Sequence, residues 1–308
     1  MAMQPGRIIK RVALGILVLA IVVESSLRLA GVVDFPLYHV DDGIGYLIRP
    51  NQAGAFLRTH SWVFNDRSMG TERAWDPAQK PNLLLIGNSI VMGGNPYAQP
   101  EKLGPLLQSR LGDRLAVWPI AVGGWTEVNE TVYLDRNPDV ASSANFFVWI
   151  VLRGGLSGLN QWHGDYVFPR ERPWSATWYV LRRYVLPRFM AFNMNELPPQ
   201  GAPTTENLHT LEAMIARLSQ ASGAKVPGVL VLYPAESDLA EARRGKEWLP
   251  ERPELERIAG KYGVRILDIA ARKDWSMAQY RDGTHPTVDG NRVLARIIGD
   301  TVSDAVRP

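Results

Sequence analysis

Cysteine is absent from this sequence of 308 residues. A disulfide framework, a cysteine nucleophile and a zinc or iron–sulfur centre held by cysteine are therefore excluded. A large excess of one charge is also missing, because 34 basic residues stand against 31 acidic ones and the formal net charge is +3. The excess comes from Arg7, Lys10 and Arg11, in an N-terminal stretch without acidic residues. The rest of the chain is balanced, which argues against a general nucleic-acid-binding surface.

Two further patterns are missing. His163, in the stretch QWHGD, has no second ligand at the spacing of a metal site, so we expect neither a metal nor another cofactor. The stretch GNSIVMGG lacks the G-x-G-x-x-G spacing of a dinucleotide-binding loop. Apolar residues make up 46% of the chain and charged residues 21%, which is the balance of a globular protein with a sizeable core.

An apolar run, VALGILVLAIVV at residues 12–23, directly follows the basic cluster. It is shorter than the ~20 residues that span a bilayer. A secretory signal peptide is one interpretation, although no clear small-x-small cleavage site follows. The interpretation that we favour is an uncleaved anchor, residues 1–33, whose helix continues through Leu29 to Val33 with Arg28 at the outer interface. A buried helix of a soluble protein fits the basic flank less well.

The basic flank also predicts orientation, since basic flanks stay on the cytoplasmic side. Both leading interpretations therefore place the body outside the cytoplasm. The anchor predicts a single-pass protein of the inner (plasma) membrane with its catalytic domain in the periplasm or the extracellular space.

The remainder of the chain divides into two parts. Residues 34–80 are rich in Asp, Gly, Pro and Asn, which predicts a small β-rich entry segment. In residues 81–308 strands alternate with helices, which predicts a three-layer α/β fold around a parallel sheet. The expected strands are 82–86, 114–121, 145–152, 227–233 and 264–269, and the expected helices are 99–111, 126–135, 205–221, 251–262 and 288–306.

Residues 156–203 interrupt this alternation with an insertion that is dense in Trp, Tyr, Arg and Pro. Its aromatic and basic residues fit the core and surface of an ordinary insertion. They fit a carbohydrate-binding wall equally well, because aromatic faces pack on sugar rings and Arg binds anionic groups. The stretch TWYVLRRYVLPRF also has the character of a basic amphipathic helix on a membrane surface. The sequence leaves these alternatives open.

Chemistry-bearing residues follow the expected strands, at the edge of an open sheet where function gathers. Ser89 follows the first strand, Gly124 follows the second, and the stretch RDGTHP after the last strand contains Asp282 and His285. A serine hydroxyl needs a base within hydrogen-bond reach, and the base needs an orienting partner. We therefore expect Ser89 as nucleophile, His285 as general base and Asp282 as its orienter. The backbone N–H groups of Ser89 and Gly124 are the expected oxyanion donors.

These blocks resemble those of the SGNH (GDSL-type) hydrolase family, from about residue 81 to residue 306. Gly-Asn-Ser at 87–89 matches the first block, PIAVGG at 119–124 the second and DGTHP at 282–286 the last. The resemblance implies a flavodoxin-like parallel sheet, with Gly124 as the oxyanion glycine. The chain also resembles envelope proteins of exopolysaccharide modification in its organisation. An anchor comes first, then the stretch DDGIGYLIRPN, and then such a domain.

One block departs from the family pattern. The family has Gly-x-Asn-Asp after its third strand, and the Asn donates to the oxyanion, whereas Leu156 occupies that position here. Leucine cannot donate, and loss of one such donor typically costs ~10²–10³ in rate. Arg153 and Asn160 are the expected replacements. We further expect the substrate to contact four residues near the blocks: Asn88, Trp125, Trp162 and His163.

The sequence thus predicts a serine esterase or O-acyltransferase that acts on an envelope or extracellular polysaccharide, and acetyl is the acyl group that we expect. Its partners would be the acylated polysaccharide or a small ester, the membrane, and for transfer a membrane protein that supplies the acyl group. The alternative prediction is a non-catalytic glycan-binding or assembly protein with a degenerate SGNH fold, which Leu156 motivates.

Overall fold

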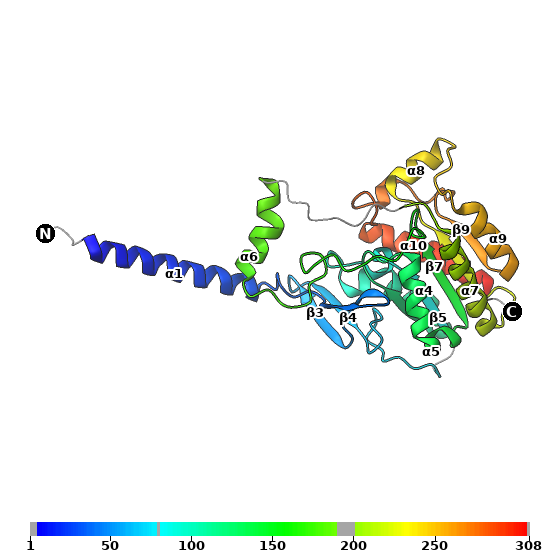
Figure 1. The fold of residues 1–308 in the computed structure, drawn as a ribbon, viewed down its shortest axis with the longest axis horizontal. Helices are drawn as coiled ribbons and strands as arrows, with labels where there is room; N and C mark the ends of the chain where they lie inside the picture. Colours follow the sequence, from blue (N-terminus) through cyan, green and yellow to red (C-terminus); the bar gives the residue numbers. More distant parts are fainter. Residues whose placement is uncertain (1–4, 79–80, 190–200, 307–308) are drawn as a thin grey trace.

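The computed structural model describes residues 5–78, 81–189 and 201–306, so part of the predicted insertion lies outside the described residues. Helix α1 (Pro5–Leu29) projects from one side of the body (Figure 1). Within its stretch Gly6–Leu29 the most apolar window of 18 residues has a mean hydropathy of 2.1, and none of that window is buried. This helix is long and apolar enough to cross a membrane, a test that a signal sequence also passes. It ends at Leu29 rather than at the expected Val33, in a turn where Gly31 has a φ of 74°.

Two antiparallel hairpins follow α1. The first pairs β1 (Tyr38–Asp41) with β2 (Gly45–Ile48), and the second pairs β3 (Gln52–Phe56) with β4 (His60–Phe64). The buried side chains of these hairpins belong to the main core. The strands lie where the β-rich entry segment was expected, while the domain boundaries themselves stay a prediction.

The body is built on a parallel sheet of five strands: β5 (Asn82–Gly87), β6 (Ala116–Ala121), β7 (Phe146–Val151), β8 (Gly228–Leu232) and β9 (Arg265–Asp268). Their order is β6-β5-β7-β8-β9, which is the 2-1-3-4-5 order of flavodoxin-like folds. The predicted fold class is therefore confirmed.

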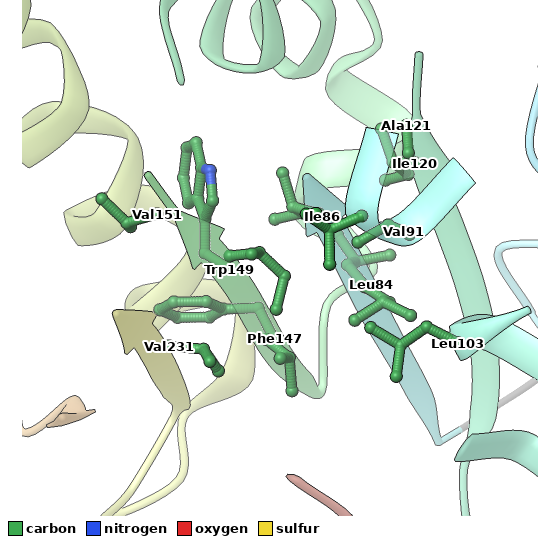
Figure 2. Close-up of a cluster of buried hydrophobic side chains, with 14 of the residues drawn as sticks. Leu84, Ile86, Val91, Leu103, Ile120, Ala121, Phe147, Trp149, Val151 and Val231 are labelled. Atoms are coloured by element: carbon green, nitrogen blue, oxygen red, sulfur yellow. The ribbon is translucent and has the colours of Figure 1, made fainter. Parts of the chain in front are cut away.

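Every residue of β5, β6, β7 and β8 is buried, as expected for strands covered on both faces. Figure 2 shows part of this core, with Leu84 and Ile86 of β5 beside Phe147 and Trp149 of β7. Large branched and aromatic side chains on adjacent strands thus fill the space between the sheet and its helices. The result is a rigid platform below the carboxyl ends of the strands.

Helices cover both faces of the sheet. The α-helices after α1 are α2 (Ser89–Met92), α3 (Leu103–Leu111), α4 (Glu127–Arg136), α5 (Pro138–Ser142), α6 (Ala176–Val180), α7 (Thr205–Ser222), α8 (Glu236–Arg243), α9 (Arg252–Tyr262) and α10 (Val288–Ala305). One layer contains α3 packed against α10, and another contains α7 in contact with α4, α5 and α9. The short helices α5 and α8 were not predicted, because each has too few residues to show a periodicity, whereas α6 overlaps the stretch TWYVLRRYVLPRF, for which a helix was one alternative.

The order of the strands reverses at β5, whose neighbours are β6 on one side and β7 on the other. The connections from these strands leave in different directions and open a crevice at the carboxyl edge, where ligands bind in such sheets. Ser89 directly follows β5 and therefore lies at this point.

Candidate active site

The nucleophile candidate sits on a tight strand-to-helix turn. Gly87 ends β5, and a Cβ there would lie 2.7 Å from a methyl carbon of Val91 and 3.2 Å from the Cβ of Ile150, so only glycine fits. The side chain of Asn88 then accepts a hydrogen bond from the N–H of Ile90 at 3.2 Å and caps α2. Asn88 is thus a buried capping residue that also lines the cleft described below. The turn leaves the hydroxyl of Ser89 at the rim of the sheet.

His285 reaches that hydroxyl from the far end of the sequence. Its Nε2 lies 2.9 Å from the Oγ of Ser89, although 196 positions separate the two residues. Its Nδ1 lies 3.0 Å and 3.1 Å from the two carboxylate oxygens of Asp282. Because a carboxylate only accepts hydrogen bonds, the Nδ1 of His285 carries the proton and its Nε2 accepts from Ser89.

Asp282 is held by its own turn. Its Oδ1 accepts the backbone N–H groups of Thr284 at 3.0 Å and His285 at 2.8 Å, and its Oδ2 accepts from the guanidinium of Arg281 at 2.9 Å. Partial burial acts to raise the pKa of Asp282, but these hydrogen bonds and the nearby imidazole together hold that pKa well below its usual range. Asp282 therefore stays ionised across the neutral pH range and orients the imidazole there.

Gly124 lies where the oxyanion glycine was expected, directly after β6. Its φ of 79° is in the left-handed region, which favours glycine. Two hydrogen bonds fix the carbonyl groups of this turn: Tyr46 donates its hydroxyl to Gly123 at 2.9 Å, and Asn160 donates its side-chain amide to Gly124 at 2.7 Å. Within the described part of the chain, the N–H groups of Ser89 and Gly124 donate to no other protein atom. Both remain candidate oxyanion donors.

Asn160 lies in the same cleft as Ser89 but is tightly engaged. Its backbone N–H and C=O both bond the side chain of Asn129, at 2.9 Å each, and its side-chain oxygen lies 2.7 Å from the Nε2 of His163. Asn160 therefore fixes the Gly124 turn from the side of the insertion. A direct contact between its amide and an oxyanion stays a prediction.

Arg153 has different partners from those expected. Its guanidinium lies 3.1 Å from carboxylate oxygens of both Asp238 and Glu241, and Arg153 lines a neighbouring cleft rather than the one that contains Ser89. The two carboxylates hold the guanidinium there, which corrects the expectation that it serves the oxyanion. Leu156 is only 2% exposed and packs in the core, so it supplies no polar group.

The cleft around Ser89 has a volume of about 700 Å³. Trp125 and His163 line it as expected, together with Phe168 and Val167 of the insertion. Trp162 does not line it, which corrects the expectation of substrate contact. Its indole N–H donates to the carbonyl of Phe168 at 2.9 Å, and Arg170 stacks on its ring at 4.1 Å, so Trp162 supports the loop that forms the wall.

Glu127 lines the cleft, and two further buried carboxyl groups, Glu130 and Glu251, lie near enough to interact with its charge; sequence patterns gave no sign of any of the three. Glu127 accepts the N–H of Leu152 at 2.8 Å, Glu130 accepts the indole N–H of Trp149 at 2.5 Å, and Glu251 accepts the N–H of Gly154 at 3.2 Å. Burial raises the pKa of Glu127 to about 7 and that of Glu130 well above its ordinary value. Among the described residues, no group of three or more His, Asp or Glu side chains has the arrangement of a metal site.

The fold and the site together define a hydrolase with a serine, histidine and aspartate at the carboxyl edge of a flavodoxin-like sheet. The model of the GDSL-like lipase/acylhydrolase family matches residues 85–293. The chain therefore belongs to this family. No curated protein matches the chain.

Solved structures resemble the chain at low identity. LAE5, an alpha/beta hydrolase enzyme from the metagenome of Lake Arreo, Spain, is 16% identical over 74% of this chain and 97% of its own, with a TM-score of 0.46. Est24, a carbohydrate acetylesterase from Sinorhizobium meliloti, is 15% identical over 73% and 99%, with a TM-score of 0.43. Axe2, an acetylxylan esterase from Geobacillus stearothermophilus, is 15% identical over 74% and 95%, with a TM-score of 0.45.

Proposed function

We propose that the protein is a serine esterase or O-acyltransferase that acts on acetyl groups of an envelope or extracellular polysaccharide. One observation carries the catalytic part of this proposal. The Nε2 of His285 lies 2.9 Å from the Oγ of Ser89, while Asp282 holds the other ring nitrogen. This is the geometry that a serine needs in order to act as a nucleophile.

In the first step His285 takes the hydroxyl proton as Ser89 Oγ attacks the acyl carbonyl. The carbonyl oxygen becomes an oxyanion, which the N–H groups of Ser89 and Gly124 stabilise. Collapse breaks the ester bond, and His285 gives its proton to the leaving alcohol. The acyl-enzyme on Ser89 is then attacked by water or by a sugar hydroxyl, with His285 again as base and then as acid. The product is a free acid in the first case and a new ester in the second.

The cleft supports the proposed class of substrate, and helix α1 supports the proposed cellular location. An open cleft of about 700 Å³ with aromatic walls from Trp125 and Phe168 has room for a sugar residue that carries an acyl group. The basic residues at the start of α1 favour a cytoplasmic N-terminus, which supports a cleft that faces the periplasm or the outside of the cell. Transfer would in addition require a membrane partner that supplies the acyl group.

Turnover by the full-length protein in detergent micelles tests the catalytic proposal. Wild type should hydrolyse p-nitrophenyl acetate, and Ser89→Ala should not. If neither form turns over while both bind acetylated glycan equally, the protein is the non-catalytic glycan-binding component instead.

An experiment in cells distinguishes hydrolysis from transfer. Loss of glycan acetylation in a deletion strain indicates transfer, and a gain indicates an esterase. Complementation with Ser89→Ala distinguishes a direct effect of catalysis from a role in assembly.

A further inference from the structure

A second helix crosses the end of α1. Helix α6 continues directly into a π-helical turn (Leu181–Val185) and a 3-10 turn (Leu186–Arg188). Figure 1 shows it lying across the axis of α1, at the end of α1 that meets the body. We call residues 174–189 the crosswise segment.

A partly exposed network of hydrogen bonds around the carboxylate of Glu24 joins the two helices. The oxygens of Glu24 accept the backbone N–H groups of Ala176 at 2.8 Å and Thr177 at 2.9 Å, at the start of α6. They also accept the hydroxyls of Ser175 at 3.0 Å and Thr177 at 2.9 Å. Arg28 adds a bond to Glu24 at 2.7 Å and another to the carbonyl of Trp174 at 2.7 Å. These bonds fix the position of the crosswise segment relative to α1.

Apolar packing reinforces the junction. Val33, Phe35 and Ala176 form a small buried cluster separate from the main core. Leu27 of α1 and Tyr179 of the crosswise segment pack against this cluster, and the rings of Tyr179 and Phe35 lie 5.2 Å apart. One side of the crosswise segment is thus used to bind the end of α1.

The opposite side carries large apolar side chains that touch no core. They recur at helical spacing and are exposed: Trp174, Trp178, Leu181, Val185 and Phe189. Trp174 is 85% exposed and Phe189 is 80% exposed, which is unusual for side chains of this size. A soluble surface rarely gathers so many in one stripe without a binding partner.

The charges of the segment have one sign. Residues 174–189 contain Arg182, Arg183 and Arg188 and no acidic residue. Arg183 is held internally by the carbonyl of Tyr166 at 2.6 Å, whereas Arg182 and Arg188 are exposed. An aromatic and aliphatic stripe with exposed arginines is the composition of helices that lie in a membrane interface, and it complements anionic headgroups.

The stripe begins beside the end of α1, where Arg28 and Glu24 bond the backbone of residues 174–177. Glu24 lies roughly 18 Å along the helix axis from Val12, the first residue after the basic cluster, at about 1.5 Å per residue, and the long basic side chains before Val12 reach the headgroups on the other side. An α1 that crosses the bilayer therefore brings the start of α6 to the interface nearer the body, and α6 lies along that surface. Trp and Tyr side chains concentrate at this depth.

We propose that the crosswise segment lies on the lipid surface from which α1 emerges, with its stripe at the boundary between headgroups and acyl chains. This inference does not depend on the proposed catalytic activity. It also predicts how the body is oriented relative to the membrane. The same insertion supplies Val167 and Phe168 to the cleft wall, and the bond from Arg183 to Tyr166 connects that wall to the crosswise segment. The segment thus holds the cleft at a fixed height above the membrane.

Single-cysteine labelling tests the proposal, because the chain has no native cysteine. Leu181→Cys probes the stripe, and Val306→Cys is the matched control. These side chains are 39% and 38% exposed, and the C-terminal end lies on the opposite side of the body from α1 (Figure 1). Each full-length variant is labelled with a fluorophore and reconstituted into vesicles of phosphatidylcholine and phosphatidylglycerol. Quenching is measured with nitroxide lipids from the bilayer and with iodide from the water.

We expect the fluorophore at Leu181 to be quenched by the nitroxide lipids and protected from iodide, with the reverse pattern at Val306. Strong iodide quenching at Leu181 would overturn the proposal. Protection from both quenchers would overturn it too, because a second copy or another protein would then cover the stripe. Phe189→Cys repeats the measurement at a side chain too exposed for its replacement to disturb the core. Arg182→Glu with Arg188→Glu in the same chain should weaken the lipid quenching.

Discussion

The buried carboxyl group of Glu127 gives the protein a specific dependence of stability on pH. Burial raises its pKa to about 7, against the lowering effect of the bond from Leu152, so the folded state favours the neutral form. Because this pKa lies above the ordinary value of 4.5, the stabilisation is complete below about pH 4.5 and is lost as the pH rises through about 7. The interval between the two values corresponds to about 3 kcal/mol of unfolding free energy, at about 1.36 kcal/mol per pH unit.

Glu127→Gln removes this dependence, since glutamine is neutral at every pH and keeps an oxygen for the N–H of Leu152. Urea unfolding of the full-length protein in detergent, followed between pH 5 and pH 8.5, should show that wild type loses stability across this range. The unfolding free energy of the Gln variant should fall less than that of wild type over this range, by up to about 3 kcal/mol. Glu212→Gln is the control, because Arg257 and Lys261 hold the pKa of Glu212 at about 2 and its charge is constant over this range. If the unfolding free energies of wild type and Glu127→Gln change with pH in the same way, the reasoning is refuted.

Three substitutions test the site. Asp282→Asn leaves the imidazole free to take the wrong tautomer, so kcat toward p-nitrophenyl acetate should fall on the order of 10²–10⁴-fold; unchanged turnover would contradict the role of Asp282. Asn160→Ala leaves the carbonyl of Gly124 without its donor, so kcat should fall roughly 10–100-fold, about 1–3 kcal/mol, with little change in KM. A change in KM alone would place Asn160 in substrate binding instead. Arg153→Ala should leave kcat unchanged, because its guanidinium lies in a neighbouring cleft, and a loss of turnover would return Arg153 to the oxyanion site.

The sheet could be predicted almost entirely from the sequence. Continuous apolar runs such as NFFVWIVL indicate strands buried on both faces, and the structure places β7 there within one residue at each end. The end of α1 could not be predicted, because the apolar pattern continues past Leu29 while the left-handed turn at Gly31 ends the helix. Short helices such as α8 lack the length for a hydrophobic period to show.

In the candidate active site, some residues could be predicted from the sequence and others could not. The positions of Ser89, Asp282 and His285 followed from short motifs, because Gly-Asn-Ser lies at the end of β5 and DGTHP lies just before α10. Arg153 was misplaced, because its partners Asp238 and Glu241 lie some ninety residues downstream and no local pattern indicates them. The support of Gly124 by Asn160 and of Gly123 by Tyr46 likewise depends on three segments that meet only in the folded chain.

The most direct test of the central claim is covalent labelling of Ser89. Full-length protein in detergent is treated with a fluorophosphonate, and the adduct is located by peptide mass spectrometry. If His285 activates the serine as the 2.9 Å contact indicates, wild type carries one adduct on Ser89, and His285→Ala carries little or none. Wild type that remains unlabelled while a related esterase reacts under the same conditions, or an adduct on another residue, would contradict the account.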